Sequence, residues 1–539
     1  MPIRVSNIRL HVDESEQSLP ARLARALDLR PADIQRWRIL RKSLDTRDKR
    51  DLAFVYSAEV VAAADEARLV EKNRSRRSQV TAELYLEPPF EMPPPGGAPL
   101  SERPVIVGSG PAGLVAACFL AELGYRPLVL ERGRKVRDRI RDVAAFDAGG
   151  PHNPESNYLF GEGGAGTFSD GKLTCRNSGP DVRRVLELFA ECKGKPSIVY
   201  DHRPHLGSNR LPAVVKAMRQ RVEAHGGEFR FDCRVEDLDW ADGQVRGLGT
   251  SSGYMKTPVV MLAIGHSARD TYEMLLARGV PMVPKPFQIG VRIEQPQEQV
   301  NRVQYGETAL EQRLGAADYS LVAKGSLDVF TFCMCAGGQI MPSVSEPGYF
   351  CTNGMSLSRR SSPFANSGLM VTLEPEMFGH RERGILAGMA LQREFEARAF
   401  AAGHGEYLCP IQMAHDFLRD RPTLGTPACS YPRGVISTRL AELIPPPVAE
   451  ALHTALPLLD RRWRGRFLEN ATLVGPEARG SSPVRLPRDA VTLEAPGIAG
   501  LYPVGEGAGY AGGIISAAVD GLRAAKAVIA RYAPLEARA

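Results

Sequence analysis

Residues 105–131, VIVGSGPAGLVAACFLAELGYRPLVLE, constrain the fold of this chain more than any other stretch. Three apolar residues at the start predict a short buried strand, and Gly108, Gly110 and Gly113 then supply a G-x-G-x-x-G turn. An apolar helix follows, and a second apolar strand closes on Glu131. This strand–turn–helix–strand–acid order is typical of a unit that binds a dinucleotide.

Each part of this unit has a physical role. Gly108 permits the tight turn, Gly110 lets the backbone approach a pyrophosphate, and Gly113 lets the helix pack against the strand. The N-terminus of the helix offers unpaired N–H groups and a partial positive charge to the phosphates. Glu131 can accept hydrogen bonds from a ribose diol and would repel a 2′-phosphate, which favours FAD or NAD over NADP.

The glycine spacing alone is weak evidence, because it occurs three times. The copy at 161–166 runs into TFSDGKLTC, which does not predict a helix, and the copy at 507–512 has no second strand after its helix. Only the first copy has the whole context.

Length and composition describe an ordinary globular protein of several domains. The chain has 539 residues, 43% of them hydrophobic and 24% charged, and its net charge of +6 suits an anionic cofactor as well as nucleic acid. No apolar run approaches the ~18 residues that span a bilayer, and no secretory signal opens the chain. Nine scattered cysteines favour neither disulfides nor a metal site. We expect a cytoplasmic protein without a membrane span or a metal, and the oligomeric state stays open.

Residues 1–95 are expected to form a small α/β domain. Strands near 3–12, 37–44, 52–61 and 80–86 and a helix near 19–29 suggest a ferredoxin-like split. The proline- and glycine-rich stretch 88–97 then predicts a linker. The hairpin carries a cluster of basic residues, which indicates either a site for RNA or an acidic partner or simply a solvated face. These residues are Arg36, Arg38, Arg41, Lys42, Arg47, Lys49 and Arg50.

The rest of the chain reads as a nucleotide-binding domain split by an insertion. Residues 160–174 hold five glycines beside polar residues, which favours close approach of backbone to a ligand. After a helix near 211–225, a strand hairpin and the strand of VVMLAIGHSA return to the first domain. Residues 271–470 are expected to form a substrate or cap domain, with strands at 328–335 and 369–373 and helices at 381–400 and 447–467. Residues 96–270 and 471–539 together then make the nucleotide-binding domain.

Three distant tracts carry a family resemblance: VIVGSGPAGL…LE, LAIGHSA and GLYPVGEGAGYAGGIISAAVDGLRAA. Together they resemble the flavoprotein superfamily of glutathione reductase and p-hydroxybenzoate hydroxylase. With FCMCAGGQIMPS, TNGMS, ANSGLMV and SSPVR, the chain is similar to a family of bacterial FAD-dependent dehydrogenases without an assigned substrate. The resemblance implies an α/β fold: a split Rossmann-type FAD-binding domain, an inserted α+β cap domain and an N-terminal appendage.

The resemblance also implies the FAD contacts. The pyrophosphate would lie on the first glycine turn, the ribose and adenine near Glu131, and the ribityl chain and ring at the C-terminal tract. That tract has Gly505-Glu506 where the superfamily usually has Gly-Asp. The implied contacts are Gly108, Ser109, Gly110, Pro111, Ala112, Gly113, Glu131, Arg132, Gly164, Gly166, Thr167, Lys172, Val235, Ala263, Gly265, Gly505, Glu506, Gly512, Gly513 and Ile514.

Few residues indicate a catalytic role. His266 could act as an acid or base near the cofactor, or could only bond the backbone there. Cys333 and Cys335 would share one face of a regular strand about 6.6 Å apart, which disfavours a disulfide and favours buried structural thiols. Asn353 and Arg359 are the substrate contacts that we expect.

We therefore expect an FAD-dependent oxidoreductase that passes a hydride to or from the flavin in a cleft between the FAD and cap domains. NAD(P)H would visit only transiently, because the chain has no second complete dinucleotide fold. The alternative is an FAD-containing protein, or a flavin-dependent RNA-modifying enzyme, that uses the basic hairpin to bind RNA or a partner. Nucleic acid is the less expected ligand.

Overall fold

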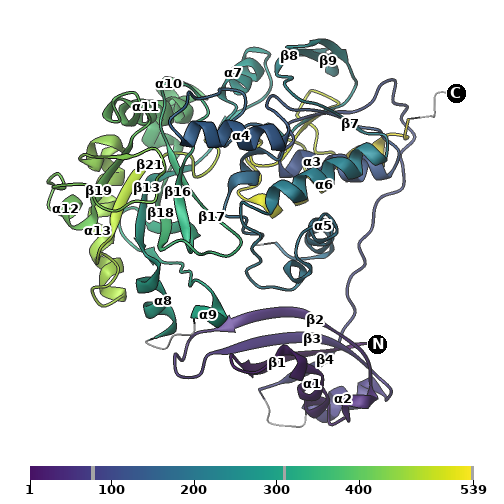
Figure 1. The fold of residues 1–539 in the computed structure, drawn as a ribbon. Helices are drawn as coiled ribbons and strands as arrows, with labels where there is room; N and C mark the ends of the chain where they lie inside the picture. The colour runs from purple at the N-terminus through teal and green to yellow at the C-terminus, as the bar shows by residue number, and fades with distance from the viewer. Residues whose placement is uncertain (75–78, 176, 307–310, 536–539) are drawn as a thin grey trace.

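The computed structural model describes residues 1–74, 79–175, 177–306 and 311–535. Figure 1 shows a small N-terminal sheet with two helices at one end of the molecule, joined by an extended segment to the larger body. In that body a parallel sheet with its helices lies beside a large mixed sheet. The expected strand at 80–86 is present as the shorter β4, and residues 75–78 lie outside the described residues.

The N-terminal sheet has the strand order β2-β3-β1-β4, and every adjacent pair is antiparallel. Its elements alternate as strand, helix, two strands, helix and strand. Helix α1 buries Leu19, Leu23 and Leu27, which recur every four residues and so share one face against the sheet. The bounds are β1 (Ile3–His11), α1 (Leu19–Leu27), β2 (Ile34–Asp45), β3 (Ala53–Ala62), α2 (Glu66–Arg74) and β4 (Thr81–Leu84).

The parallel sheet has the order β23-β11-β5-β6-β7 and is covered on both faces, so its short central strands are apolar throughout. Helices α3 and α14 pack together on one face. The strands are β5 (Val105–Val107), β6 (Leu128–Leu130), β7 (Glu228–Arg230), β11 (Val260–Leu262) and β23 (Leu501–Pro503). The helices are α3 (Pro111–Glu122), α4 (Val136–Asp147), α5 (Pro180–Glu191), α6 (Leu211–Ala224), α7 (Arg269–Ala277) and α14 (Ile514–Arg531).

A small antiparallel sheet, β10-β9-β8, lies over the other face of the parallel sheet and shares a core with it. Its strands are β8 (Val235–Ala241), β9 (Gln244–Thr250) and β10 (Gly253–Lys256).

The mixed sheet has the order β14-β15-β18-β13-β21-β19-β20 and holds the largest core. Its strands are β13 (Phe287–Pro296), β14 (Val322–Ala323), β15 (Val329–Cys335), β18 (Phe364–Leu373), β19 (Cys409–Met413), β20 (Val435–Ser437) and β21 (Thr472–Glu477). Two further pairs are β12 (Val283–Pro284) with β22 (Val484–Arg485), and β16 (Gly338–Pro342) with β17 (Thr352–Ser356). The helices are α8 (Gln297–Tyr305), α9 (Glu311–Leu314), α10 (His380–Arg383), α11 (Ala387–Ala402), α12 (Ala414–Leu418) and α13 (Pro446–Arg462).

Three expectations for this region are corrected. The helix expected at 381–400 is two helices, because Gly384 takes a left-handed φ of 83° and ends α10. The helix expected at 447–467 ends at Arg462. The regular strand expected around Cys333 is wrong: β15 has a bulge between Phe332 and Cys335, and Cys333 itself has a φ of 44°.

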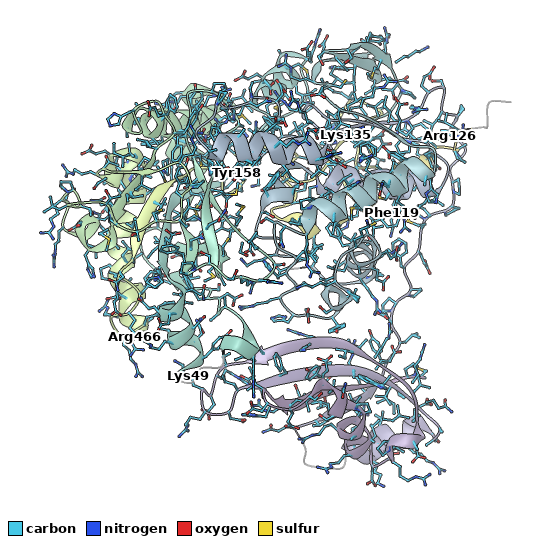
Figure 2. All side chains as sticks on the ribbon, viewed as in Figure 1. Lys49, Phe119, Arg126, Lys135, Tyr158 and Arg466 are labelled. Carbon is cyan, nitrogen blue, oxygen red and sulfur yellow. The ribbon has the colours of Figure 1, made fainter. Side chains whose placement is uncertain are left out.

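The N-terminal sheet touches the larger body through the long hairpin of β2 and β3. The backbone N–H of Lys42 donates to Tyr200 O at 2.9 Å, and the N–H of His202 donates to Lys42 O at 2.8 Å. Lys49, in the turn of the hairpin, donates to the carbonyl of Val303 in α8, and Figure 2 shows it at the junction of the two parts. Across the described ranges, every helix is too short or too polar to cross a membrane.

Candidate functional site

The three tracts that carry the glycine motifs meet around one cavity of about 270 Å³. It opens where the parallel sheet faces the mixed sheet, and both parts contribute to its lining. Most of the expected cofactor contacts line it: Gly108, Ser109, Gly110, Pro111, Ala112, Glu131, Arg132, Gly164, Gly166, Val235, Ala263, Gly265, Glu506, Gly512, Gly513 and Ile514.

Two helices begin at this cavity. Gly110 is the N-cap of α3 and Gly513 is the N-cap of α14, and neither residue has a side chain to occupy the free N–H groups of the first turn. Both helices therefore turn their positive ends and free donors toward the cavity. Such a pair of termini can hold an anionic group at one point and stabilise developing negative charge at a second.

The glycines of the cavity separate into two kinds. A Cβ added to Gly110, Gly265 or Gly512 would meet no atom within 4 Å, so the backbone there borders open space that a ligand can approach. A Cβ on Gly108 would lie 2.4 Å from Ala263 O, and its φ of +102° already requires glycine. The first kind forms a bare backbone cradle, which fits a cofactor with a pyrophosphate and a flat ring.

Glu131 lies at the end of β6, is 5% exposed and lines the cavity. One carboxylate oxygen accepts from the N–H and hydroxyl of Ser109, at 3.0 and 2.6 Å. The other accepts from the N–H groups of Gly133 and Gly161, both at 3.0 Å. The carboxylate thus joins three loops, and the four donors fill its roughly four acceptor sites. Three of these donors are backbone N–H groups, so only the Ser109 hydroxyl can rotate away and free a site for a ribose hydroxyl.

Four expected contacts lie outside the lining. Gly113 allows α3 to approach the glycine turn, because its Cβ would lie 2.0 Å from Gly108 O. The Thr167 hydroxyl donates to Glu162 O at 3.0 Å, and Gly505 N–H donates to the carboxylate of Asp520 at 2.7 Å. Lys172 lies behind the wall and donates to Met334 O.

His266 stands on the cavity wall beside Glu506, with 3.4 Å between its Nδ1 and the Glu506 Oε1. The two tracts that carry them are held together by Tyr272, whose hydroxyl donates to Gly507 O at 2.6 Å. The Glu506 carboxylate can therefore hold and orient an imidazole that faces a bound ligand.

The mixed sheet closes the cavity with a different kind of wall. Phe332, Cys333, Asn353 and Arg479 line it, whereas Arg359, the other expected substrate contact, is exposed and is not part of the lining. Fully buried Arg292 lies behind this wall. Its guanidinium donates to Asn353 Oδ1 at 3.2 Å, to Cys333 O at 2.7 Å and to Glu477 Oε2 at 2.9 Å.

Buried carboxylates behind this wall differ in their partners. Burial raises the pKa of Glu477 to about 7, which Arg292 only partly opposes, and Glu477 Oε1 has no hydrogen-bond partner. Glu396 is also fully buried, but Arg269 and Arg479 each form an ion pair with it at 2.7 Å. These two guanidinium groups outweigh burial and lower the pKa of Glu396 to about 2.

Phe332, Arg479, Arg292 and Glu477 are site residues that the sequence did not single out. Only Arg292 had a signal in the sequence, as a charged residue inside the apolar run FQIGVRIEQP. A charge in a strand whose faces are both buried must find a partner, but the partner, Glu477, lies in β21, 185 residues away.

The basic residues of the N-terminal hairpin have partners within the chain. Arg38 contacts Glu59 and Glu87, and Arg36 lies 3.6 Å from Glu59. The remaining pairs are Arg41 with His202, Lys42 with Glu16, Arg47 with Asp45, Lys49 with Val303 O, and Arg50 with Asp48. Five of these seven side chains thus lie beside a carboxylate, whereas Arg41 and Lys49 have a histidine and a backbone carbonyl as partners.

Comparison with protein families gives three matches. Residues 286–480 match the family described as FAD-dependent protein, C-terminal domain-like. Residues 106–164 match the NAD(P)-binding Rossmann-like domain, and residues 2–61 match a domain of unknown function. A protein of Clostridium beijerinckii, described as uncharacterized, is 40% identical over 537 residues, which are 99% of each chain.

Two solved structures are distantly similar to this chain. L-proline dehydrogenase of P. horikoshii is 12% identical with a TM-score of 0.36, over 80% of this chain and 93% of its own. Glycine oxidase of Bacillus cereus is 13% identical with a TM-score of 0.32, over 79% of this chain and 94% of its own. Likeness of this degree leaves the substrate open.

Proposed function

Because this chain belongs to a bacterial family of FAD-dependent oxidoreductases, we propose that the cavity between the parallel sheet and the mixed sheet holds FAD and a small substrate together. One observation supports this most: Glu131, Gly265 and Gly512, which lie in three distant tracts, line the same cavity. The substrate would lie between the glycine cradle and the wall formed by the mixed sheet.

Different residues would bind different parts of FAD. The N-terminus of α3, with Gly108 to Ala112, would hold the pyrophosphate, and Glu131 and Arg132 would hold the adenosine ribose. The N-terminus of α14, at Gly512, Gly513 and Ile514, would face the flavin ring and stabilise negative charge there. Bound FAD supplies the hydride or electron chemistry. The aromatic ring of Phe332 and the packed wall around it would keep water away from the substrate.

Polar groups on the wall would orient the substrate and move its proton. Asn353 is held by Arg292 and presents its amide to the cavity, and Arg479 adds a fixed positive charge. His266 is the group placed to take or give a proton, because Glu506 can steady its imidazole. NAD(P)H, if it is the reductant, would bind transiently in the same cleft.

The domain assignment that supports this function is also a proposal. Residues 96–270 and 471–539 would form the FAD-binding domain, and residues 271–470 the inserted cap. Residues 1–95 would form a ferredoxin-like domain, which its βαββαβ element order and its strand order β2-β3-β1-β4 support.

The first experiment measures flavin in the purified protein. We expect a yellow protein with one FAD per chain, and anaerobic mixing with NADH, NADPH or candidate substrates should bleach the flavin for the true reductant. Protein that is colourless and cannot be reconstituted with FAD would contradict the proposal.

A second experiment tests the placement of the substrate. Once a reductant is found, Asn353→Ala should slow flavin bleaching by up to about tenfold, because one hydrogen bond is worth about 0.5–1.5 kcal/mol. Arg359→Ala is the matched control, since Arg359 is exposed outside the cavity. Equal effects of the two substitutions would place the substrate elsewhere.

A further inference from the structure

Cys333 stands on the cavity wall at the bulge of β15. It is partly exposed, and its left-handed φ of 44° turns it out of the regular strand pattern. Cys335, two residues on, is fully buried behind it. The bulge removes the parallel arrangement of side chains that a regular strand would impose on these two cysteines.

The two cysteines are in direct contact. The Cys335 thiol donates to the backbone oxygen of Cys333 at 3.2 Å. Neither of the two takes part in a disulfide.

Two cations from different parts of the chain donate to the backbone of this turn. Lys172, from the glycine-rich loop, donates to Met334 O, between the two cysteines, and forms an ion pair with Asp170 at 2.9 Å. Arg292, from β13, donates to Cys333 O. The Asp170 carboxylate is itself bonded by Ser356 and lies 3.5 Å from His205, so Lys172 is fixed in place.

These surroundings favour a thiolate at one cysteine only. The hydrogen bond from Cys335, followed by the charges of Lys172 and Arg292, lowers the pKa of Cys333 below its usual value, against burial and the Asp170 carboxylate. Burial raises the pKa of Cys335. Glu477, whose own pKa is raised in part by Cys333, completes the charged groups around the thiolate. Cys429, also partly exposed, shows the opposite: burial and Glu294 raise its pKa.

We propose that Cys333 and Cys335 are a redox-active dithiol that reduces a small disulfide admitted to the cavity, with Cys333 attacking and Cys335 resolving. A small, linear organic disulfide is the substrate class, because Cys333 lies on the wall of the cavity and not on a flat outer surface. The inference goes beyond the hydride transfer proposed above and does not depend on which compound reduces the flavin.

The reaction conserves atoms and electrons. The Cys333 thiolate attacks one sulfur of the disulfide, a mixed disulfide forms, and the first thiolate leaves. Cys335 then attacks the Cys333 sulfur, the second thiolate leaves, and its departure takes up the proton that Cys335 loses. The dithiol has given two electrons and become a disulfide, and the substrate has become two thiols. An excess of external dithiol reverses the step.

The experiment treats the FAD-loaded protein with bis-hydroxyethyl disulfide and reads peptide masses. We expect the peptide that carries both cysteines to lose two hydrogens, with release of two thiols per chain, and dithiothreitol to restore it. Cys335→Ser should instead stop at a stable mixed disulfide on residue 333. Cys429→Ser, the matched control, should behave as the wild type.

Two results would overturn the proposal: a wild-type protein that retains a stable mixed disulfide, or Cys333 that reacts no faster than Cys429. Flavin absorbance is recorded on the same samples. If the protein forms the internal disulfide but cannot bind FAD, this inference holds and the proposed function fails. If the protein binds FAD but Cys333 does not react, the proposed function holds and this inference fails.

Lys172 is proposed as a positioning residue, and its test is a pH profile. Alkylation of Cys333 by iodoacetamide should be half-maximal at a lower pH in the wild type than the ~8.5 of a free cysteine. Lys172→Met should move the midpoint up by about one pH unit, and Lys172→Arg should restore most of the shift because it keeps the charge. A midpoint that is the same in all three proteins would show that Lys172 has only a structural role.

Discussion

The two walls of the cavity are built by different means. The wall from the parallel sheet is mostly backbone: glycines, two helix N-termini and one carboxylate that bonds to loop N–H groups. The wall from the mixed sheet is made of side chains, with buried arginines and carboxylates behind a thiol, an amide and an aromatic ring. A backbone wall suits a cofactor that many proteins share, and a side-chain wall can be specific to one substrate.

The largest effect is expected when the buried ion pairs behind the side-chain wall are removed. Glu396→Gln leaves buried Arg479 without its ion-pair partner and Arg269 with Glu346 alone, so the free energy of unfolding should fall by about 3–5 kcal/mol. Urea denaturation measures it. Glu394→Gln, on the same helix but in an exposed pair with Arg398, should change it by less than about 0.5 kcal/mol. Similar losses in the two variants would mean that the buried network does not stabilise this wall.

The next effect is a pH dependence of stability that we expect from Glu477 and not from Glu396. The pKa of Glu477 is about 7 when folded and near 4.5 when unfolded, so the folded protein binds the extra proton between these values. Its contribution to stability is therefore present at low pH and is lost as pH rises from 4.5 through 7, by roughly 2–3 kcal/mol. Glu477→Gln should remove that part of the slope in urea unfolding between pH 5 and 7.5. An unchanged slope would mean that Glu477 stays charged throughout.

A third prediction tests the backbone wall where it is tightly packed. Alanine usually stabilises a helix relative to glycine by about 1 kcal/mol. In Gly113→Ala, however, the new methyl group would lie 2.0 Å from Gly108 O, so we expect a loss of about 1–3 kcal/mol in the FAD-free protein. Thermal unfolding of the apo protein measures it, and a stabilised variant would show that α3 can move away from the turn.

The smallest effect tests the same wall where it borders open space. A methyl group on Gly110 meets no protein atom within 4 Å, so Gly110→Ala should leave the apo protein as stable as before. It should weaken FAD binding by about tenfold, or about 1.4 kcal/mol, because the pyrophosphate must approach that backbone. Titration with FAD measures this. Gly97→Ala in the linker, which also meets nothing within 4 Å, should bind FAD normally, and equal affinities of the two variants would place the cofactor elsewhere.

The comparison explains what could be predicted. Gly108, Gly110 and Glu131 can be predicted from the sequence because a dinucleotide turn is local. Its glycines, helix and acid lie within 27 residues, and each is required by backbone geometry. Arg359 is predicted as a substrate contact because it follows a motif, yet it faces solvent. Asn353, the other predicted substrate contact, lines the cavity because Arg292, from another strand, holds it there.

The sequence by itself determined that this chain has a Rossmann-type unit and belongs to the FAD-dependent family, because those signals depend on contacts between residues close in the chain. Only the tertiary structure decided the character of the opposite wall. The Arg292–Glu477 pair, the two arginines on Glu396 and the Lys172 contact at the bulge of β15 join residues more than 80 positions apart. Burial makes those charges depend on their partners, and no local pattern in the chain records which partner each one meets.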